Sequence, residues 1–149
     1  MEMRMNYYET NPEALQALLA LEKFASSTGI DRNLYELIKI RASQINGCAF
    51  CIDMHAKDLL ESGESLDRIL LLTVWCEVPI YSEKERAAIE LTECVTRLSE
   101  SGVPKEVYDN VRAHFDEKQF VDLIMAINAI NCWNRIGIST GMFPGCMIK

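Results

Sequence analysis

The sequence predicts an all-helical protein. Apolar residues recur every three or four positions over most of the chain, as they do along one face of an α-helix. No stretch shows the sustained alternation of apolar and polar residues that is typical of a half-buried strand. Helix-capping residues and prolines divide the chain into about seven periodic segments. We therefore expect a single domain over residues 1–149, folded as a compact bundle of about seven helices.

The first two helices are marked by their N-caps. Asn11 precedes Pro12, a pair typical of a helix start because proline lacks the N–H that the first turn leaves unpaired. This helix should run to about Ala25, and Asp31 can cap a second helix over residues 32–45. The second helix is apolar on more than one side, which predicts that neighbouring elements cover it.

The third helix follows a turn. Asn46-Gly47 is a strong turn signal, and the apolar and helix-forming residues after it predict a helix from near Cys48 to about Glu61. A short apolar helix is expected next, over residues 66–75.

Three more helices complete the bundle. Ser82 and Glu85 have the spacing of a capping box and open a helix that should end near Ser99. Two further helices are expected over residues 105–114 and 117–139, and the last one is dense in apolar residues. The tail after it reads as irregular.

A polar stripe runs along the last predicted helix. It consists of Asn128, Asn131 and Arg135, with Asn134 beside them, and we interpret it as a hydrogen-bonding seam between helices or between subunits. The second and last helices are apolar on more sides than one small subunit can easily cover. We therefore expect a homo-oligomer.

Charge and composition exclude several classes of protein. The net charge is −7 and no two basic residues are adjacent, which argues against a nucleic-acid partner or an anionic membrane surface. No apolar run of 18 residues is present, and residues 1–8 lack the apolar core of a signal peptide. Six unevenly spaced cysteines do not form a secreted disulfide framework, so a reducing cytoplasm is the expected location.

Four cysteines stand singly in apolar surroundings. We interpret them as buried thiols that act as small apolar side chains. They are Cys76, Cys94, Cys132 and Cys146.

The motif that carries chemistry is a Cys-x-x-Cys pair, Cys48 and Cys51, followed by His55. On a helix the two thiols lie about 60° apart, and His55 follows Cys51 by one turn. Thiols at the positive end of a helix dipole favour the thiolate. The spacing alone allows a redox pair, a zinc site with two thiolates and an imidazole, or core thiols placed by coincidence. No second Cys-x-x-Cys supports structural zinc, and no βαβ pattern supports a thioredoxin-type fold.

Residues 40–55, which contain this motif, resemble the signature of the carboxymuconolactone decarboxylase-like superfamily. The Cys-x-x-Cys pair is similar to that of its alkyl hydroperoxidase D-like branch. Residues 82–92 and 131–135 resemble other blocks of the family, so that the likeness extends from about residue 34 to 138. The resemblance implies an all-helical subunit, a trimer or hexamer, and a peroxidase or disulfide-reductase activity.

The resemblance also implies a catalytic set: Glu36, twelve positions before Cys48, together with Cys48, Cys51 and His55. In the expected cycle, His55, oriented by Glu36, deprotonates Cys51, and the thiolate attacks a hydroperoxide. Cys48, nearer the helix start and expected to be more exposed, then forms a disulfide with the sulfenic acid. A lipoyl-like dithiol restores both thiols, and no haem, flavin or metal is needed. Peroxidases of the branch carry a second histidine where this chain has Phe50, which implies a simpler proton relay.

Two other functions are compatible with the motif. One is a helical binding or assembly protein in which the Cys pair holds zinc or merely packs in the core. The other is decarboxylation of a carboxymuconolactone, which is the weaker interpretation because the decarboxylases of the superfamily generally lack the Cys pair.

Overall fold

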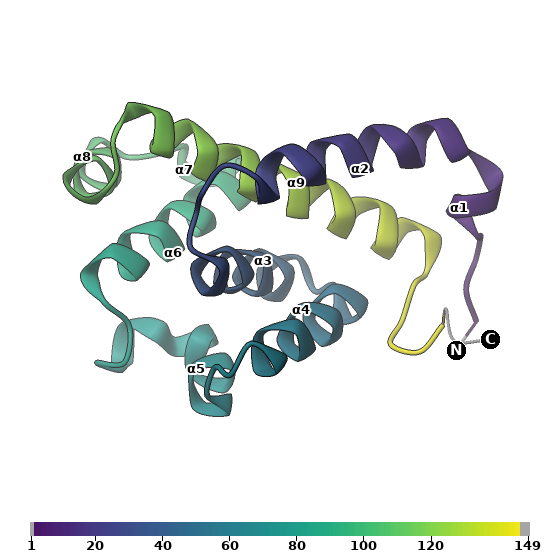
Figure 1. Ribbon diagram of the computed structural model, residues 1–149, viewed down its shortest axis with the longest axis horizontal. Helices are drawn as coiled ribbons and strands as arrows, with labels where there is room; N and C mark the ends of the chain where they lie inside the picture. Colours follow the sequence, from purple (N-terminus) through teal and green to yellow (C-terminus); the bar gives the residue numbers. More distant parts are fainter. Residues whose placement is uncertain (1, 147–149) are drawn as a thin grey trace.

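The computed structural model describes residues 2–146, and this part of the chain contains helices and turns but no strand (Figure 1). The prediction of an all-helical protein is confirmed. In chain order the helices are α1 (Tyr7–Thr10), α2 (Pro12–Ser26), α3 (Arg32–Asn46), α4 (Ala49–Glu61), α5 (Leu66–Leu70), the 3₁₀ segment η1 (Leu71–Glu77), α6 (Glu83–Thr96), α7 (Leu98–Ser101), α8 (Lys105–His114) and α9 (Glu117–Thr140). None of these helices combines the length and apolar character that a membrane span needs.

Helix α3 is the centre of the fold. It packs against α4, α6 and α9 at the same time, and Figure 1 shows it in the middle of the molecule. Leu34 and Ile38 on one side of α3 join a core cluster with α6, α8 and α9, whereas Leu37 and Ile40 join a second cluster with α4 and η1. The expected burial of this helix between neighbours is confirmed.

The capping residues form the predicted hydrogen bonds. Asn11 Oδ1 accepts a hydrogen bond from the Ala14 N–H at the start of α2, and the Asp31 carboxylate accepts one from the Leu34 N–H at the start of α3, each 3.0 Å long. Ser82 forms the expected capping box at the start of α6. These local contacts place the helix starts within one residue of their predicted positions.

The helix count and two boundaries differ from the prediction. The segment predicted as one helix over 66–75 is the short α5 followed by the 3₁₀ turns of η1. The segment predicted to end near Ser99 ends at Thr96, and the single turn α7 follows it. Helix α1, capped by Asn6, was not predicted. One-turn helices are too short to show a periodic apolar pattern, so they leave no signal of this kind in the sequence.

The apolar faces of α3 do not support the expected oligomer. Leu37, Ile38 and Ile40 are fully buried within the single subunit. The prediction that one subunit cannot cover all the apolar sides of this helix was wrong, because helices distant in the sequence already cover them. Helix α2 has the opposite character. Of its fifteen residues only Ala25 is buried, and Figure 1 shows α2 lying on the outside of the molecule along α9.

The single cysteines are not buried as predicted. Cys76 is exposed, and Cys94, Cys132 and Cys146 are half-buried. Successive residues of an α-helix point about 100° apart, so that apolar neighbours in the sequence do not place a thiol on the buried side.

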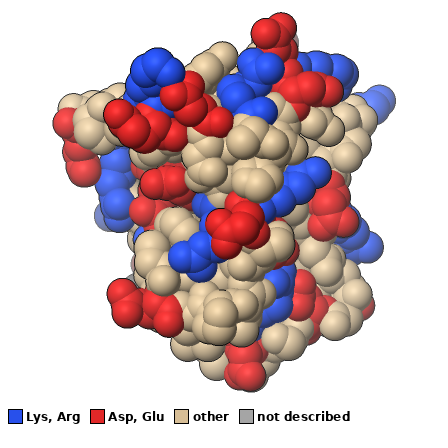
Figure 2. Space-filling model, turned by 90° about the vertical axis from the view of Figure 1, so that its left-hand side faces the viewer, with Lys and Arg blue, Asp and Glu red and all other residues tan. Residues whose placement is uncertain are grey.

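One face of the molecule carries mixed charge (Figure 2). On the face at the α6 and α8 end of the molecule, Figure 2 shows acidic and basic side chains close to one another, separated by uncharged residues. Among the described residues, this face carries no continuous basic stripe (Figure 2).

Candidate active site

His55 and Glu36 form a buried pair between α4 and α3. Nδ1 of His55 lies 2.8 Å from Oε2 of Glu36, and the two residues are 5% and 9% exposed. Sequence reasoning offered no cause for burying Glu36 apart from its offset from Cys48. The structure supplies the cause, because α4 packs along α3 and brings the imidazole to the carboxylate.

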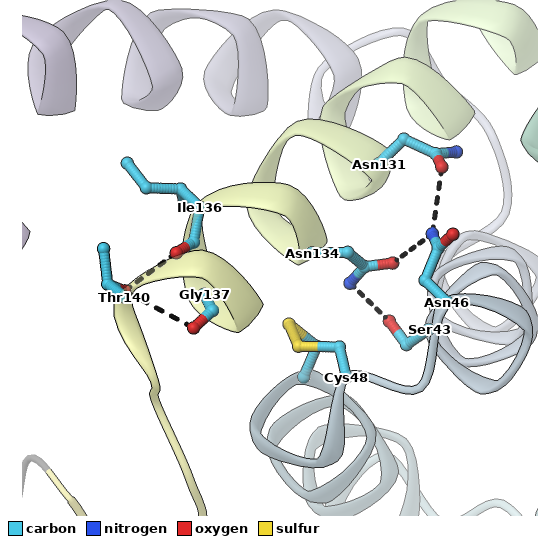
Figure 3. Close-up of a disulfide and its surroundings, with 9 residues drawn as sticks. Ser43, Asn46, Cys48, Asn131, Asn134, Ile136, Gly137 and Thr140 are labelled. Atoms are coloured by element: carbon cyan, nitrogen blue, oxygen red, sulfur yellow. Dashed lines mark hydrogen bonds between the residues drawn. A yellow bond between two sulfur atoms is a disulfide. The ribbon is translucent and has the colours of Figure 1, made fainter. Parts of the chain in front are cut away.

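Cys48 and Cys51 are joined by a disulfide at the start of α4. Cys48 is the N-cap residue, Cys51 is in the first turn, and their Cα atoms are 5.4 Å apart. The expectation that Cys48 is the more exposed of the two is wrong, since Cys48 is 2% exposed and Cys51 3%. The start of α4 faces helix α9 and not the solvent, which explains the burial (Figure 3).

A seam of amides holds the turn that precedes Cys48. The Asn46 amide donates hydrogen bonds to Oδ1 of Asn131 (3.0 Å) and of Asn134 (2.9 Å), and the Asn134 amide donates one to Oγ of Ser43 (2.9 Å), as Figure 3 shows. These bonds tie the end of α3 to α9 within one subunit. They therefore fix the position of the backbone from which α4, and with it the disulfide, begins.

The polar stripe predicted on the last helix is only partly correct. Asn131 takes part in the seam, whereas Asn128 and Arg135 are exposed. Asn134 replaces them, because the side of α9 that faces α3 passes through positions 131 and 134.

A cavity of about 610 Å³ lies beside the disulfide. Glu36, Cys51 and His55 contribute to its wall, and Cys48 does not. The remaining lining residues come from α1, α2, α3, α4, α9 and the tail, and they are mostly aromatic or apolar: Tyr7, Tyr8, Leu19, Glu22, Ser26, Arg32, Tyr35, Lys39, Phe50, Met54, Asp58, Trp133, Gly137 and Met142. The structure thus brings three of the four predicted site residues to one cavity and bonds the fourth to Cys51.

Comparison with known proteins agrees with this architecture. The model of the carboxymuconolactone decarboxylase family matches residues 12–93. The chain belongs to this family. It is 49% identical over 141 residues to the uncharacterised protein YdfG of Bacillus subtilis, a match that covers 95% of this chain and 96% of YdfG.

The chain also belongs to the AhpD-like branch of this family. A crystal structure from Agrobacterium tumefaciens, of a protein of unknown function provisionally described as an antioxidant defence protein AhpD, superposes with a TM-score of 0.93. The two chains are 43% identical, and the match covers 96% of this chain and 99% of the other. The alkyl hydroperoxide reductase AhpD of Coxiella burnetii is 45% identical over 40 residues, which is 27% of this chain and 23% of that protein. The resemblance read from the sequence is confirmed.

Opposite charges also meet in the wall of the cavity. Glu22 of α2 forms an ion pair with Lys39 of α3 and accepts hydrogen bonds from the Tyr35 hydroxyl (2.9 Å) and the Trp133 indole N–H (3.1 Å). Burial by itself raises the pKa of Glu22, but the charge of the Lys39 ammonium and the hydrogen bonds from Lys39, Tyr35 and Trp133 outweigh it and hold this pKa below its usual range. Burial and the neighbouring Glu22 raise the pKa of Tyr35.

Sequence reasoning missed this network and one further acid. Tyr35 and Lys39 share a face of α3 with Glu36, which helical spacing could have indicated, but nothing in the sequence connects them to Glu22. Asp58 follows His55 by three residues, and its carboxylate is 4.0 Å from the same Nδ1 that contacts Glu36. The i,i+3 spacing was the available signal.

One group of side chains in the described part of the chain has the geometry to share a cation. Glu36, His55 and Asp58 have ligand atoms that lie within 4.8 Å of one another. The group contains neither cysteine, so it differs from the zinc site that the Cys-x-x-Cys pair suggested. Carboxylates and a ring nitrogen are ligands that several divalent cations accept.

Proposed function

We propose that this AhpD-like protein is a thiol-dependent peroxidase, or more broadly a disulfide oxidoreductase, that reduces hydroperoxides through the Cys48–Cys51 pair. One observation carries the proposal. Cys51, which can form a disulfide with Cys48, borders the same cavity as a buried imidazole–carboxylate pair. A thiol needs a base to become a nucleophile, and a resolving thiol to be regenerated after oxidation.

In the first step, His55 removes the proton of Cys51. The neutral imidazole has one N–H and one free lone pair, and the hydrogen bond from Nδ1 to Glu36 leaves Nε2 as the acceptor. His55 follows Cys51 by one turn of α4, so that the two side chains are neighbours on the helix. Glu36 orients the ring and stabilises the imidazolium that forms.

In the second step, the Cys51 thiolate attacks the outer oxygen of the hydroperoxide. A sulfur–oxygen bond forms and the oxygen–oxygen bond breaks, which leaves Cys51 as a sulfenic acid. The departing alkoxide takes the proton held by His55 and leaves as an alcohol. The aromatic and apolar lining of the cavity suits an organic hydroperoxide with an apolar body.

In the third step, the Cys48 thiol gives up its proton and its sulfur attacks the sulfur of Cys51; the sulfenic hydroxyl takes that proton and leaves as water, and the disulfide forms. A dithiol donor, lipoyl-like by analogy with the family, then returns both cysteines to thiols. The catalytic set is therefore Glu36, Cys48, Cys51 and His55, and this cycle calls for no resident cofactor.

The proposal extends to assembly and location. The fifteen-residue helix α2 leaves Phe24, which does not line the cavity, exposed, and this supports a homo-oligomer in which another copy covers this helix. A trimer or hexamer of single-domain subunits, spanning residues 1–149, is the arrangement proposed. Four cysteines outside the disulfide support a reducing cytoplasm as the compartment.

The main alternative is a binding or assembly protein with a zinc-holding or structural Cys pair. Zinc held by both thiolates is incompatible with a sulfur–sulfur bond, and the cation-compatible group here is Glu36, His55 and Asp58. A cysteine redox pair at the cavity wall does not support decarboxylation of a lactone as the activity.

The test is peroxide consumption by the purified protein. The assay supplies hydrogen peroxide or an organic hydroperoxide, together with a panel of dithiol donors, and thiols are titrated before and after each peroxide addition. Loss of two thiols per subunit with formation of one alcohol supports the proposal. Stoichiometric zinc in fresh protein, with thiols that resist peroxide, would instead support the alternative.

A further inference from the structure

The cavity has a second polar group besides the cysteine pair and His55. Glu22 of α2 lines it together with Tyr35 and Lys39 of α3 and Trp133 of α9. Tyr35 and Lys39 donate hydrogen bonds to Oε1 of Glu22, and the Trp133 indole donates one to Oε2. Three helices thus meet at a hydrogen-bonded network in the cavity wall, and the proposed redox cycle uses none of its four side chains.

Lys39 is the member of this network that keeps unused donors. An ammonium has three N–H groups, and among the described residues Lys39 has one oxygen acceptor, Glu22. The Tyr35 hydroxyl and the Trp133 indole N–H are each taken up by Glu22, whose own low pKa keeps it ionised and without a proton to donate. The Lys39 ammonium is held over the Tyr35 ring at 4.3 Å, and the residue is 4% exposed. A fixed, buried donor therefore lies in the cavity wall.

We infer that Lys39 binds an oxygen atom of the substrate, and that this substrate is an uncharged hydroperoxide with an aromatic body and a second oxygen acceptor such as a carbonyl. The inference rests on the proposed redox function of the cavity. Lys39 follows Glu36 by three residues on α3, and side chains with this spacing have Cβ atoms about 5–6 Å apart. A substrate with its peroxide group at Cys51 can therefore present its second oxygen to Lys39.

The walls beside these polar groups favour an aromatic body. Aromatic rings that meet edge to face or in an offset stack gain more than burial alone provides. Methionine sulfur also makes favourable contacts with rings. The cavity offers both kinds of partner: Tyr7, Tyr8, Phe50, Met54, Trp133 and Met142. A planar ring therefore gains more in this cavity than an aliphatic group of equal area.

The charges in the wall favour an uncharged ligand. Three carboxylates, Glu22, Glu36 and Asp58, line the cavity against two basic side chains, Arg32 and Lys39. Lys39 is already paired with Glu22, so a carboxylate on the ligand would lie beside the Glu22 carboxylate. Like charges repel, whereas a carbonyl oxygen accepts a hydrogen bond from Lys39 without adding a charge.

Binding of product alcohols tests the inference without any peroxide. Three ligands share the body of cumyl alcohol and differ in one ring substituent, which is an acetyl group, an isopropyl group of similar size, or a carboxylate. Isothermal titration calorimetry with the reduced protein gives each Kd, and the meta and para isomers are measured separately.

The acetyl ligand should bind best. We expect its better isomer to bind about tenfold more tightly than the isopropyl counterpart, because the carbonyl accepts a hydrogen bond from a charged donor. The carboxylate should bind more weakly than the acetyl ligand. Equal or reversed Kd values for acetyl and isopropyl would overturn the role of Lys39, and a tighter carboxylate would overturn the uncharged class.

The aromatic body is tested with unsubstituted cumyl alcohol and its fully hydrogenated cyclohexyl counterpart. The cyclohexyl form is the more apolar of the two, so tighter binding of the aromatic form cannot come from burial alone. We expect the aromatic form to bind about threefold or more tightly. Equal binding, or tighter binding of the cyclohexyl form, would overturn this part of the inference.

Variants identify the donor. The double variant Glu22→Leu, Lys39→Met removes the ammonium without leaving the carboxylate unpaired, and it should bind the acetyl and isopropyl ligands equally. Lys23→Met, at an exposed lysine of α2 that does not line the cavity, is the matched control and should keep the tenfold preference. A preference that survives in the double variant would refute Lys39 as the donor. If circular dichroism shows that the double variant does not fold, the wild-type ligand series still decides.

These outcomes separate the inference from the proposed function. A protein that prefers the acetyl ligand but consumes no hydroperoxide keeps the binding site and loses the redox function. A protein that consumes hydroperoxide without any preference among the ligands keeps the function and refutes the inference.

Discussion

At the scale of single residues, the candidate site consists of the Cys51 sulfur at the cavity wall and the His55 imidazole, which Glu36 holds in place. The Nδ1–Glu36 contact of 2.8 Å sets the orientation of His55, and the buried setting strengthens this interaction relative to water. Phe50, at the place where related peroxidases carry a second histidine, also lines the cavity. In the proposed cycle the proton relay therefore depends on His55 and its carboxylate partner.

The two cysteines should have separable roles. Cys51→Ser is expected to abolish peroxide consumption, because no other thiol lines the cavity in the described part of the chain. Cys48→Ser should still form a sulfenic acid, which persists because it has no resolving thiol. Labelling with a dimedone-type reagent followed by mass spectrometry checks both. Cys76→Ser, at an exposed thiol, serves as the control and should behave as wild type. A label that appears on Cys48 and never on Cys51 would reverse the roles.

Removal of the Glu36 charge should impair catalysis without unfolding the protein. General acid–base assistance is typically worth about 10²–10⁴-fold, so we expect Glu36→Gln to reduce peroxide turnover by about 10²-fold. The reduced variant should require a higher pH for the reaction of Cys51 with iodoacetamide, because its base has lost its partner. The pH profile of that reaction is the measurement, with circular dichroism as the check on folding. Identical profiles and equal turnover would leave Glu36 as an ordinary buried glutamate.

At the scale of secondary-structure elements, α3 joins the site to the core. Its cavity side carries Tyr35, Glu36 and Lys39, while its other sides hold the two large apolar clusters. Glu22 of α2 accepts hydrogen bonds from Tyr35 and Lys39 and so connects α2 to α3. A shift of either helix would therefore change the shape of the cavity.

The Glu22–Lys39 pair should stabilise the fold in a pH-dependent way. Lys39 is 4% exposed, and loss of one partner of a buried pair typically costs about 3–5 kcal/mol; because Glu22 is partly exposed, we expect Lys39→Met to cost about 3 kcal/mol at pH 7. The pKa of Glu22 lies below its ordinary value of 4.5 in the folded protein. Its contribution is therefore present above pH 4.5 and is lost as the pH falls further.

Urea unfolding of both proteins between pH 3 and 7 measures this contribution. The difference between wild type and Lys39→Met should shrink as the pH falls below 4.5. The double variant Lys39→Met, Glu22→Leu is the control, and it should recover part of the lost stability because no unpaired charge remains. A difference that stays constant over the whole pH range would show that the pair contributes by packing alone.

At the scale of the whole molecule, the cavity forms where helices from distant parts of the chain pack together. Helices α1, α2, α3, α4 and α9 each contribute to its wall, although they come from opposite ends of the chain (Figure 1). Helix α2 covers the cavity on one side and leaves its own outer side bare. A second subunit on α2 would cover this apolar surface and stabilise the helix that closes the cavity.

The proposed oligomer can be tested through α2. Light scattering at micromolar concentration should give three or six times the subunit mass of 16.9 kDa. Phe24→Asp, which puts a charge on the bare side of α2, should dissociate the assembly, because an unpaired charge is costly at an apolar interface. Leu98→Asp, on the exposed turn α7, should leave the mass unchanged. A wild-type monomer at this concentration would refute the oligomer.

The sequence by itself determined the helical class, the helix starts and the family. These properties are local or nearly so. A cap such as Asp31 bonds to a backbone N–H three residues away, and apolar spacing reflects the geometry of a single helix. The motif from Cys48 to His55 lies within two turns of one helix, so its spacing was enough to bring the thiols and the imidazole together. The family resemblance contributed Glu36.

The tertiary structure alone decided which groups surround this motif. Glu22 meets Lys39 and Trp133 because α2, α3 and α9 pack together, and no local pattern encodes that meeting. The same holds for the burial of Cys48, which sequence reasoning placed nearer the solvent. A helix start is exposed in isolation, and only the approach of α9 encloses it. Contacts between helices distant in sequence depend on packing of the whole chain, and these contacts decide which sulfur faces the cavity.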